Sequence, residues 1–458
     1  MNGSFPISAK AALTLCLLPI LMAYALAHGA EEGQLFSPAD LGYLTITQFA
    51  LLTIIMLFVW YKSPDSDNLN DYKWLLVVAV IARCALIPIT PYTSNDIDRY
   101  LFDGYIASSG LDPYSISHNA AQLADKIHLW NPPAEHAKYV TLYPPLAVAL
   151  YAVAASTGPE FAPIVWKVMI AMASLATLLF SVRTLRHLNK LKYLSLIALS
   201  PILILEAGIG AHIDSFAALF VSMAIYYWVT KKHFIVGVCI GLGVLVKLLP
   251  LVLIGPLFLY ASNWIIKRNL TLGLVASLAL GYSIAFAVGW LPFGSLGVFF
   301  EKFRFGSPLF TLLENALSSK VLAITIPIIL LLGYGILAIY SLIVGKQQDS
   351  TKLLVALQVS FSLPLLLGPV VYPWYLMALV PLVAVAPKPW LLVWLSILPI
   401  TYEVLGPWLC CQQWQPSTWP LIVTALSVLL SLAFTTIRTH YSTVFTARLL
   451  SPFRSEAN

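Results

Sequence analysis

The chain has 458 residues, of which 59% are hydrophobic and only 10% are charged, with a formal net charge of +6. Ordinary soluble domains carry about 25% charged residues, so this composition excludes a soluble enzyme, a disordered protein and a nucleic-acid-binding protein. The alternating strand-sized segments of an outer-membrane barrel are absent, which leaves an all-α polytopic membrane protein as the predicted fold class. The cysteines form no CxxC motif and predict no disulfide framework.

Apolar runs that approach the roughly 20 residues of a membrane span recur along the whole chain. We predict a single membrane domain, residues 1–458, with about 13 to 14 membrane-spanning helices. The first run ends in Ala25-Leu26-Ala27, which resembles a signal-peptidase site, but only Lys10 precedes it, so we expect a retained span. The predicted spans are 10–27, 43–61, 73–90, 163–183, 193–210, 213–230, 234–248, 250–262, 270–290, 319–344, 352–370, 373–386, 390–409 and 418–437.

The segment 143–158, which begins YPPL, decides the orientation of everything after it. If it crosses the membrane, basic residues such as Lys190 and Lys231 lie outside; if it does not, they lie inside. Cytoplasmic loops are enriched in Lys and Arg, and the segment is short and contains Pro144 and Pro145. We therefore predict a re-entrant or interfacial helix on the outer side, with both termini of the chain in the cytoplasm.

The longest loop covers residues 91–142 and is predicted to be extracytoplasmic. A loop of this length is usually functional or has secondary structure of its own, and we expect short amphipathic helices at about 97–109 and 119–129. A second extracytoplasmic loop is predicted at 291–318. The cytoplasmic loops are short and contain no P-loop motif, so chemistry is expected in the membrane or on the outer face.

An acidic cluster follows the outer end of the third predicted span, where Asp96, Asp98 and Asp103 accompany Arg99 and Tyr100. A carboxylate at the mouth of a membrane cavity can act as a general base on a sugar hydroxyl. A single loop Asp is usually only solvated, but the clustering favours a catalytic role for Asp96. The other two acids stay open, because Asp103 could simply pair with Arg99. Asp96 and Asp98 could also bind a divalent metal, but none is predicted.

Further ionisable residues mark two other outer turns. Lys247, in VLVKLLP, lies near the bilayer, where a Lys is costly and often functional. Its compact charge suits a phosphate, although it could also extend to lipid headgroups. His212 and Asp214 follow Glu206, an intramembrane acid that is either functional or held by a buried cation. Arg304, in the second outer loop, is either another phosphate contact or a surface residue.

Aromatic and histidine residues complete the candidates. Tyr372 and Trp374 lie in an outer turn, where aromatic residues usually belong to the membrane belt, so stacking on a sugar is the less common alternative. His118, His128 and His136 lack metal-site spacing and are interpreted as loop histidines.

Several of these segments together resemble a known family. The stretch SNDIDRYLFDGYIASSGLDPY followed by TLYPPLA is similar to the polytopic GT-C glycosyltransferases, above all to bacterial glycosyltransferase family 87 and related mannosyltransferases. Their first large outer loop opens with such an acidic segment and closes with a Y-P-P-L helix. Later turns of the family are similar to GAHIDS, VLVKLLP, FRFGSPLF and VVYPWYL, in the same order. The resemblance runs from about residue 94 to 380, and its first motif is the most specific.

The resemblance implies a GT-C-like bundle and an inverting hexosyltransferase. It would move a sugar, usually mannose, from a polyprenyl-phosphate donor to a glycan, lipid or protein acceptor. Its active site would lie on the extracytoplasmic face of a bacterial plasma (inner) membrane, with a loop Asp as base and no required cofactor.

The acidic motif differs from the family pattern at two positions. Asp96 matches the second Asp of the family, whereas Asn95 replaces the first and Asp98 replaces a Tyr. The base is therefore Asp96 or Asp98. Substrate contacts are expected from Arg99, Tyr100, Asp103, Tyr143, His212, Asp214, Lys247, Arg304, Tyr372 and Trp374.

Two other functions are alternatives to a transferase. A lipid-linked sugar flippase or other polytopic transporter predicts ionisable residues along a path through the membrane, yet here they gather at the outer face. A non-catalytic membrane subunit predicts a donor that is bound but never consumed. The expected partners are the lipid bilayer, the lipid-linked donor and the acceptor, with no nucleic acid.

Overall fold

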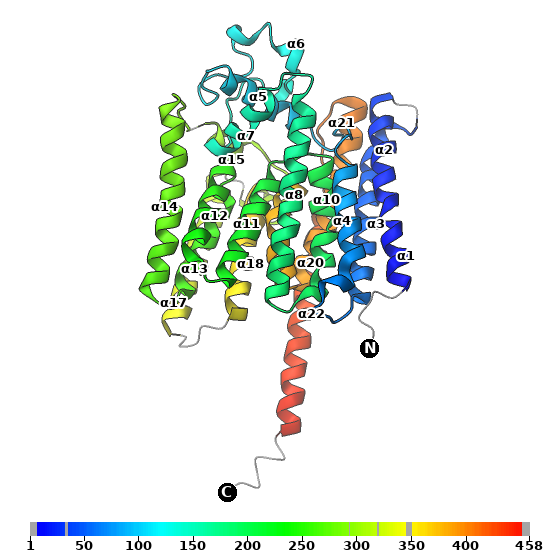
Figure 1. Cartoon of the computed structure of the whole chain (residues 1–458), viewed down its shortest axis with the longest axis vertical. Coiled ribbons are helices and arrows are strands. Elements are labelled where there is room, and N and C mark those ends of the chain that lie inside the picture. Colours follow the sequence, from blue (N-terminus) through cyan, green and yellow to red (C-terminus); the bar gives the residue numbers. More distant parts are fainter. Residues whose placement is uncertain (1–6, 33–34, 293, 318–319, 345–349, 451–458) are drawn as a thin grey trace.

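The computed structural model describes residues 7–32, 35–292, 294–317, 320–344 and 350–450. Helices make up the regular structure of these residues, apart from one isolated bridge between Phe305 and Val370. The helices form an upright bundle, with α5, α6 and α7 gathered at one end, which we call the loop end (Figure 1). The prediction of an all-α polytopic membrane protein is confirmed.

Six described helices are long and apolar enough to cross a membrane. Most of the other predicted spans are apolar helices that are shorter than that, including Asp214–Val229 and His233–Val246. The six long helices are Lys10–Glu31, Pro38–Lys62, Ala162–His187, Leu191–Gly208, Trp264–Ala287 and Pro389–Cys411.

The first elements form one side of the bundle. Arg83, which is buried near the end of α4, donates to the carbonyls of Ile197 and Ala198 and to Ser174 Oγ. Its charge is thus solvated by carbonyl and hydroxyl oxygens, which ties α4 to neighbouring helices. The elements are α1 (Ile7–Leu15), α2 (Leu17–Glu32), η1 (Pro38–Asp40), α3 (Leu41–Lys62), η2 (Leu69–Tyr72) and α4 (Lys73–Ala85).

The long loop contains α5 (Asp96–Ser108), η3 (Ala121–Leu123), α6 (Ile127–Trp130), η4 (Ala134–His136) and α7 (Pro145–Ala155). The helix predicted at 97–109 is confirmed. The helix predicted at 119–129 is wrong, because only η3 and a single turn, α6, form there.

The YPPL segment forms α7, with Pro145 at the first position of the helix. Backbone N–H groups in the first turn have no acceptor within the helix, so the missing N–H of proline costs no hydrogen bond there. Helix α7 packs closely on α5 at Gly104. A Cβ at this position would lie only 2.4 Å from the Tyr151 carbonyl, so the contact requires glycine. Both helices lie at the loop end (Figure 1). The re-entrant or interfacial placement of 143–158 stays a prediction.

The middle of the chain packs through glycine contacts typical of membrane helices. A Cβ at Gly237 would lie 2.1 Å from the Leu270 carbonyl, and one at Gly273 would lie 2.0 Å from the Phe234 carbonyl. The backbones of α12 and α14 are therefore in contact. The elements are α8 (Ala162–His187), η5 (Leu191–Tyr193), α9 (Ser195–Ala198), α10 (Pro201–Gly208), α11 (Asp214–Val229), α12 (His233–Val246), η6 (Leu249–Leu253), α13 (Ile254–Tyr260) and α14 (Trp264–Ala287).

The last part of the chain returns to the loop end twice. The predicted loop 291–318 contains two helices and is tied to the segment before η7, since Val371 N donates to the Phe305 carbonyl at 2.7 Å. The elements are α15 (Leu296–Lys302), α16 (Pro308–Leu317), α17 (Lys320–Val344), α18 (Ser350–Leu367), η7 (Pro373–Leu379), α19 (Val380–Val385), α20 (Pro389–Ile397), η8 (Leu398–Val404), α21 (Leu405–Cys411) and α22 (Trp419–Leu450).

One covalent feature was not expected from the sequence. The adjacent residues Cys410 and Cys411 form a disulfide at the end of α21. The prediction that the cysteines form no disulfide is therefore wrong for this pair.

Candidate active site

A cavity of about 390 Å³ lies between the long loop and the helices at the loop end. Its charged lining and its polar lining apart from Gln412 come from residues before 250, and its aromatic lining comes mostly from residues after 298. The lining residues are Thr93, Ser94, Asn95, Asp96, Arg99, Glu135, His136, Leu142, Tyr143, Lys247, Phe299, Phe303, Tyr372, Trp374, Tyr375, Trp408, Gln412 and Trp414.

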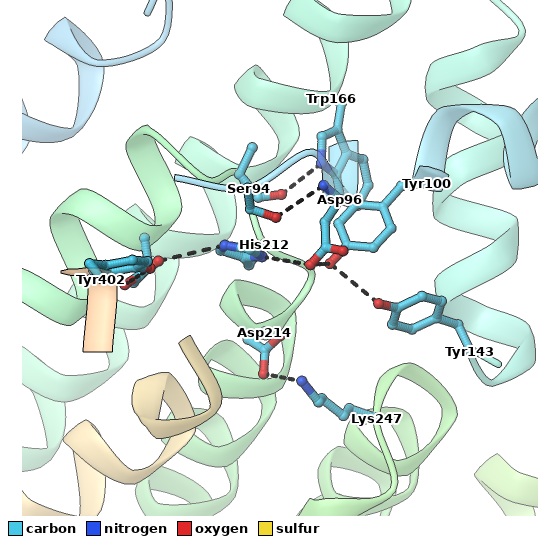
Figure 2. Close-up of polar contacts among 11 residues, drawn as sticks. Ser94, Asp96, Tyr100, Tyr143, Trp166, His212, Asp214, Lys247 and Tyr402 are labelled. Carbon is cyan, nitrogen blue, oxygen red and sulfur yellow. Dashed lines mark hydrogen bonds and ion pairs between the residues drawn. The ribbon is translucent and has the colours of Figure 1, made fainter. Parts of the chain in front are cut away.

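Asp96 begins α5 and faces this cavity. Its backbone N–H donates to Ser94 Oγ at 3.0 Å, and Tyr100 donates its hydroxyl to Asp96 Oδ2 at 3.3 Å from one turn further along. A carboxylate in the first turn is stabilised by the helix dipole. His212 Nδ1 approaches the same oxygen to 3.4 Å (Figure 2). The start of α5 therefore holds the carboxylate in one position.

The charge state of Asp96 follows from these neighbours. Burial alone would raise the pKa of Asp96, but the contact with His212 and the charges of His136 and Arg99 lower it to about 2. Asp96 is therefore an ionised carboxylate at neutral pH, which is the form that can accept a proton.

The turn between α10 and α11 fixes the orientation of His212. Ala211 adopts a left-handed backbone conformation with φ 51°, which is uncommon for a residue with a Cβ. The Ala211 carbonyl accepts a hydrogen bond from Trp166 Nε1 at 2.8 Å. A Cβ at Gly210 would lie 2.3 Å from His212 Nε2. The turn thus requires glycine at 210 and directs the imidazole toward Asp96.

The other side of the His212 ring faces Glu206. His212 Nε2 lies 3.6 Å from Glu206 Oε2, and Tyr402 donates its hydroxyl to Glu206 Oε1 at 2.6 Å. Both His212 and Glu206 are fully buried. The alternative that a buried cation such as Lys247 or Arg83 holds Glu206 is wrong, since Tyr402 and His212 are its neighbours.

Lys247 reaches the cavity from the end of α12. Its Nζ lies 2.5 Å from Oδ1 of Asp214, the first residue of α11 (Figure 2). The same ammonium lies 3.7 Å from the centre of the Tyr375 ring, within the range of a cation–π contact. Lys247 is thus held in place by an anion and by an aromatic face while it lines the cavity.

Arg99 supplies a second cation to the cavity. Its guanidinium lies 5.9 Å from the centre of the Tyr143 ring, and Tyr143 in turn packs edge-on against Tyr100. No carboxylate of the described residues lies within ion-pair distance of Arg99. The planar guanidinium is therefore available to an anionic ligand.

The aromatic wall is a stack of rings. Trp374 lies on the His212 ring at 3.9 Å between centres, Tyr372 lies on Trp374 at 4.3 Å, and Phe305 lies on Tyr372 at 4.5 Å. Trp374 is only 7% exposed. Tyr372 and Trp374 therefore belong to the cavity wall, and their assignment to a lipid-facing aromatic belt is wrong.

Six predicted site residues do not line the cavity, and three of them, Tyr100, His212 and Asp214, instead contact side chains that line it. Asp98 lies on α5 outside it. Asp103 is buried with its Oδ1 2.8 Å from His118 Nε2, so His118 is its ion-pair partner in place of the expected Arg99. Arg304 pairs with Glu314 through contacts of 3.0 Å. Among the described residues, no group of three or more His, Cys, Asp or Glu side chains is placed to hold a metal.

A comparison with protein families bears on this site. A family model described as alpha-(1->6)-mannopyranosyltransferase, N-terminal domain, matches residues 15–263, which is more than half of the chain. The chain belongs to this family. The resemblance to GT-C membrane mannosyltransferases is thereby confirmed, and the chain is a glycosyltransferase by family. No curated protein and no solved structure matches the chain.

This mannosyltransferase family member also has cavity residues that sequence reasoning missed. Glu135 accepts a hydrogen bond from Asn95 Nδ2 at 2.7 Å. Burial and the charge of Arg99 lower the pKa of His136 to about 4, so its imidazole is neutral at pH 7. Trp414 and Gln412 close the cavity from the far end of the chain. No spacing pattern marks these residues, because the path of the long loop brings Glu135 and His136 to the cavity and the end of α21 brings Gln412 and Trp414 there.

Proposed function

We propose that this protein is an inverting glycosyltransferase that moves mannose from a polyprenyl-phosphate donor to a glycan, lipid or protein acceptor on the extracytoplasmic face. The single observation that carries the proposal is the cavity, where an ionised carboxylate, two cations and an aromatic wall face one another. The family match supports mannose transfer in general. The donor, the face of the membrane and the roles of individual residues are our inference.

Asp96 is the proposed general base. An acceptor hydroxyl is a weak nucleophile, and a positioned carboxylate that accepts its proton typically accelerates such a step by about 10²–10⁴-fold. The low pKa of Asp96 keeps the carboxylate ionised across the working pH range. Inversion needs one in-line displacement, so a second carboxylate acting as nucleophile is not required.

Lys247 and Arg99 are proposed to hold the donor phosphate. The bond between the anomeric carbon and the phosphate oxygen breaks during transfer, and the phosphate leaves with the electron pair. A cation fixed at its oxygens stabilises the negative charge that develops in the transition state. Both cations line the same cavity as Asp96, which is the arrangement that this step needs.

A second, apolar cavity of about 650 Å³ supports a lipid-linked donor. It lies between α5, α7, α12 and α14, and Leu245 and Pro145 are among its lining residues. Lys247 and Tyr143, two residues away on the same segments, line the polar cavity. We propose that the isoprenoid chain occupies the apolar cavity while the phosphate lies at Lys247.

The proposal is tested by reconstituting the purified protein in vesicles with polyprenyl-phosphate-[14C]mannose and extracted membrane glycolipids. We expect radiolabel in the acceptor fraction and release of polyprenyl phosphate in equal amounts. Movement of intact donor across the bilayer without release of polyprenyl phosphate would instead support the flippase alternative. Donor that is bound but never consumed would support a non-catalytic subunit.

A further inference from the structure

A disulfide between two adjacent residues lies beside the polar cavity. Cys410 and Cys411 end α21, which lies at the loop end of the bundle (Figure 1), and both are exposed. Trp408, two residues before the bridge, and Gln412, directly after it, line the cavity. The bridge is therefore flanked on both sides by residues of the cavity wall, although neither cysteine lines the cavity itself.

The bridge restricts the backbone at the end of α21. It closes a small ring that contains the peptide group between the two cysteines, so the torsion angles on either side of that group no longer rotate independently. Gln412 follows with a left-handed φ of 53°, and its N–H donates to the Trp408 carbonyl at 2.9 Å. Such a conformation is uncommon for a residue with a Cβ and persists only where the surroundings impose it. The bridge is the covalent part of those surroundings.

The chain after the bridge has few other attachments. Residues 413–417 form no helix or strand, and all of them are exposed. At the far end, Ser417 donates its backbone N–H to Glu403 Oε1 at 2.7 Å and its hydroxyl to Glu403 Oε2 at 3.1 Å. Trp414 lies between the two attachments, where its ring packs 5.3 Å from Phe305 and lines the cavity. The position of Trp414 therefore depends on the bridge at one end and on Glu403 at the other.

The bridge is open to chemical reduction. A thiolate must reach one of the two sulfur atoms to open a disulfide, and exposed bridges are the labile ones. Among the other cysteines, Cys16 and Cys239 are buried and unpaired, whereas Cys84 is exposed and unpaired. The proposed function assigns the loop end to the extracytoplasmic side, where disulfides form and persist. The oxidised bridge is then the resting form, and an external dithiol is needed to open it.

We propose that the Cys410–Cys411 bridge is a thiol–disulfide switch that sets how tightly the acceptor binds, by positioning Trp414 in the cavity wall. The switch rests on the proposed transferase function and adds regulation to its acceptor site. A dithiol opens the bridge by exchange: the sulfur–sulfur bond breaks, each cysteine sulfur gains one electron and one proton, and the dithiol loses two of each and becomes a disulfide. Gln412 can then leave the left-handed conformation, and Trp414 loses its fixed position.

The switch should act on binding of the acceptor and leave the chemical step unchanged. The proposed base and phosphate contacts, Asp96, Arg99 and Lys247, lie on α5 and at the end of α12, so α21 does not carry them. The apolar cavity proposed for the isoprenoid chain is lined by none of residues 408–414, all of which the structure describes. An aromatic contact is worth about 2- to 12-fold in affinity, so opening the bridge should raise the KM for the acceptor by that factor.

The test compares transfer by the reconstituted full-length protein before and after treatment with dithiothreitol, with extracted membrane glycolipids as acceptor. We expect reduction to raise the KM for the acceptor by about 2- to 12-fold, with kcat unchanged, and reoxidation to restore it. The double variant Cys410→Ser with Cys411→Ser should show the raised KM without reductant and no further response. Cys84→Ser is the control, because it removes the other exposed cysteine, and it should respond like the wild type.

Trp414→Ala separates positioning of the ring from a general effect on stability. If the bridge acts through Trp414, the KM of this variant is already raised, and dithiothreitol should change it by less than about 2-fold. A full response in Trp414→Ala would overturn the proposal. So would an unchanged wild-type KM after reduction that mass spectrometry of the alkylated protein shows to be complete. A fall in kcat with unchanged KM would also overturn it, because that is the signature of a bridge that only stabilises the fold.

A second measurement does not depend on transfer. Quenching of Trp414 fluorescence by acrylamide, obtained as the difference between the wild type and Trp414→Phe, should increase when the bridge is reduced. Trp419 is the matched control, because it is similarly exposed and lies beyond the contact between Ser417 and Glu403. Its quenching, obtained with Trp419→Phe, should not change. Unchanged quenching of Trp414 after complete reduction overturns the switch even if the enzyme transfers mannose. Increased quenching in a protein that transfers no mannose would refute only the proposed function.

Discussion

The two halves of the chain contribute different types of side chain to the same cavity. The family-matched residues 15–263 supply its charged and ionisable side chains, namely Asp96, Arg99, Glu135, His136 and Lys247. The described residues after 263 supply no charged side chain to the cavity. They form its aromatic wall instead, which consists of Phe299, Phe303, Tyr372, Trp374, Tyr375, Trp408 and Trp414.

The two contributions meet at two ring contacts. Trp374 stacks on His212 at 3.9 Å, and Tyr375 lies 3.7 Å from Lys247 Nζ. The aromatic half therefore orients the ionisable groups of the other half. We infer that the first half carries the chemical step and the second half selects and places the sugar. Changes in the first half should mainly lower kcat, and changes in the wall should mainly raise KM.

The largest expected effect is that of Asp96→Asn. The amide keeps the shape of the side chain but cannot accept the acceptor proton, so kcat should fall by about 10²–10⁴-fold. Donor binding and thermal stability in detergent should change little. Single-turnover transfer of labelled mannose measures the chemical step directly. A folded Asp96→Asn enzyme with full activity would remove Asp96 as base and with it the chemical role of the first half.

Lys247→Gln should have the next largest effect. Removing the cation should lower kcat by about 10²–10³-fold, because the leaving phosphate loses its stabilisation. It also leaves Asp214 buried and unpaired, which destabilises the fold. The double variant Lys247→Gln with Asp214→Asn should therefore recover thermal stability without recovering transfer. Recovery of transfer in the double variant would show that the pair is purely structural.

Trp414→Ala tests the aromatic half. The Trp414 ring packs 5.3 Å from Phe305 and lines the cavity with 44% of its surface exposed. An aromatic contact of this kind is worth about 0.5–1.5 kcal/mol, which corresponds to a rise of about 2- to 12-fold in KM for the acceptor. Trp419→Ala is the control, since Trp419 is similarly exposed but does not line the cavity. A fall in kcat with unchanged KM would contradict the division between the halves.

The elements that could be predicted from sequence are those set by local patterns. The apolar runs predicted the helix bundle. The acidic start of α5, with Gly110 beyond its end, predicted the helix that holds Asp96. The motifs also marked His212, Lys247 and Trp374 as candidates. Local patterns show which residues share a helix face, because that follows from the helical repeat alone.

The rest depends on contacts between distant segments. No spacing predicts that Asp103 pairs with His118, that Tyr402 donates to Glu206, or that Arg304 is held by Glu314. Nor does any pattern indicate that His136 turns into the cavity. These pairings depend on how helices pack and how the long loop returns, and a single sequence does not encode that in any local repeat.

The smallest expected effect on transfer is that of Asp98→Asn. Asp98 lies in the same half and on the same helix as Asp96 but outside the cavity. Transfer should therefore stay within about 2-fold of the wild type. A loss comparable to that of Asp96→Asn would instead make Asp98 the base.

The same variant has a stability signature with a definite sign. Burial raises the pKa of Asp98 to about 6, above its ordinary value, so the folded state holds this proton more tightly than the unfolded state. The wild type is therefore unpenalised below about pH 4, loses stability as the pH rises toward 6, and carries the full penalty above it. Asp98→Asn should match the wild-type Tm at pH 4 and exceed it by about 2 °C at pH 7.5. If the difference in Tm between Asp98→Asn and the wild type were equal at both pH values, the Asp98 carboxylate would be solvated. Position relative to the cavity would then not distinguish Asp98 from Asp96.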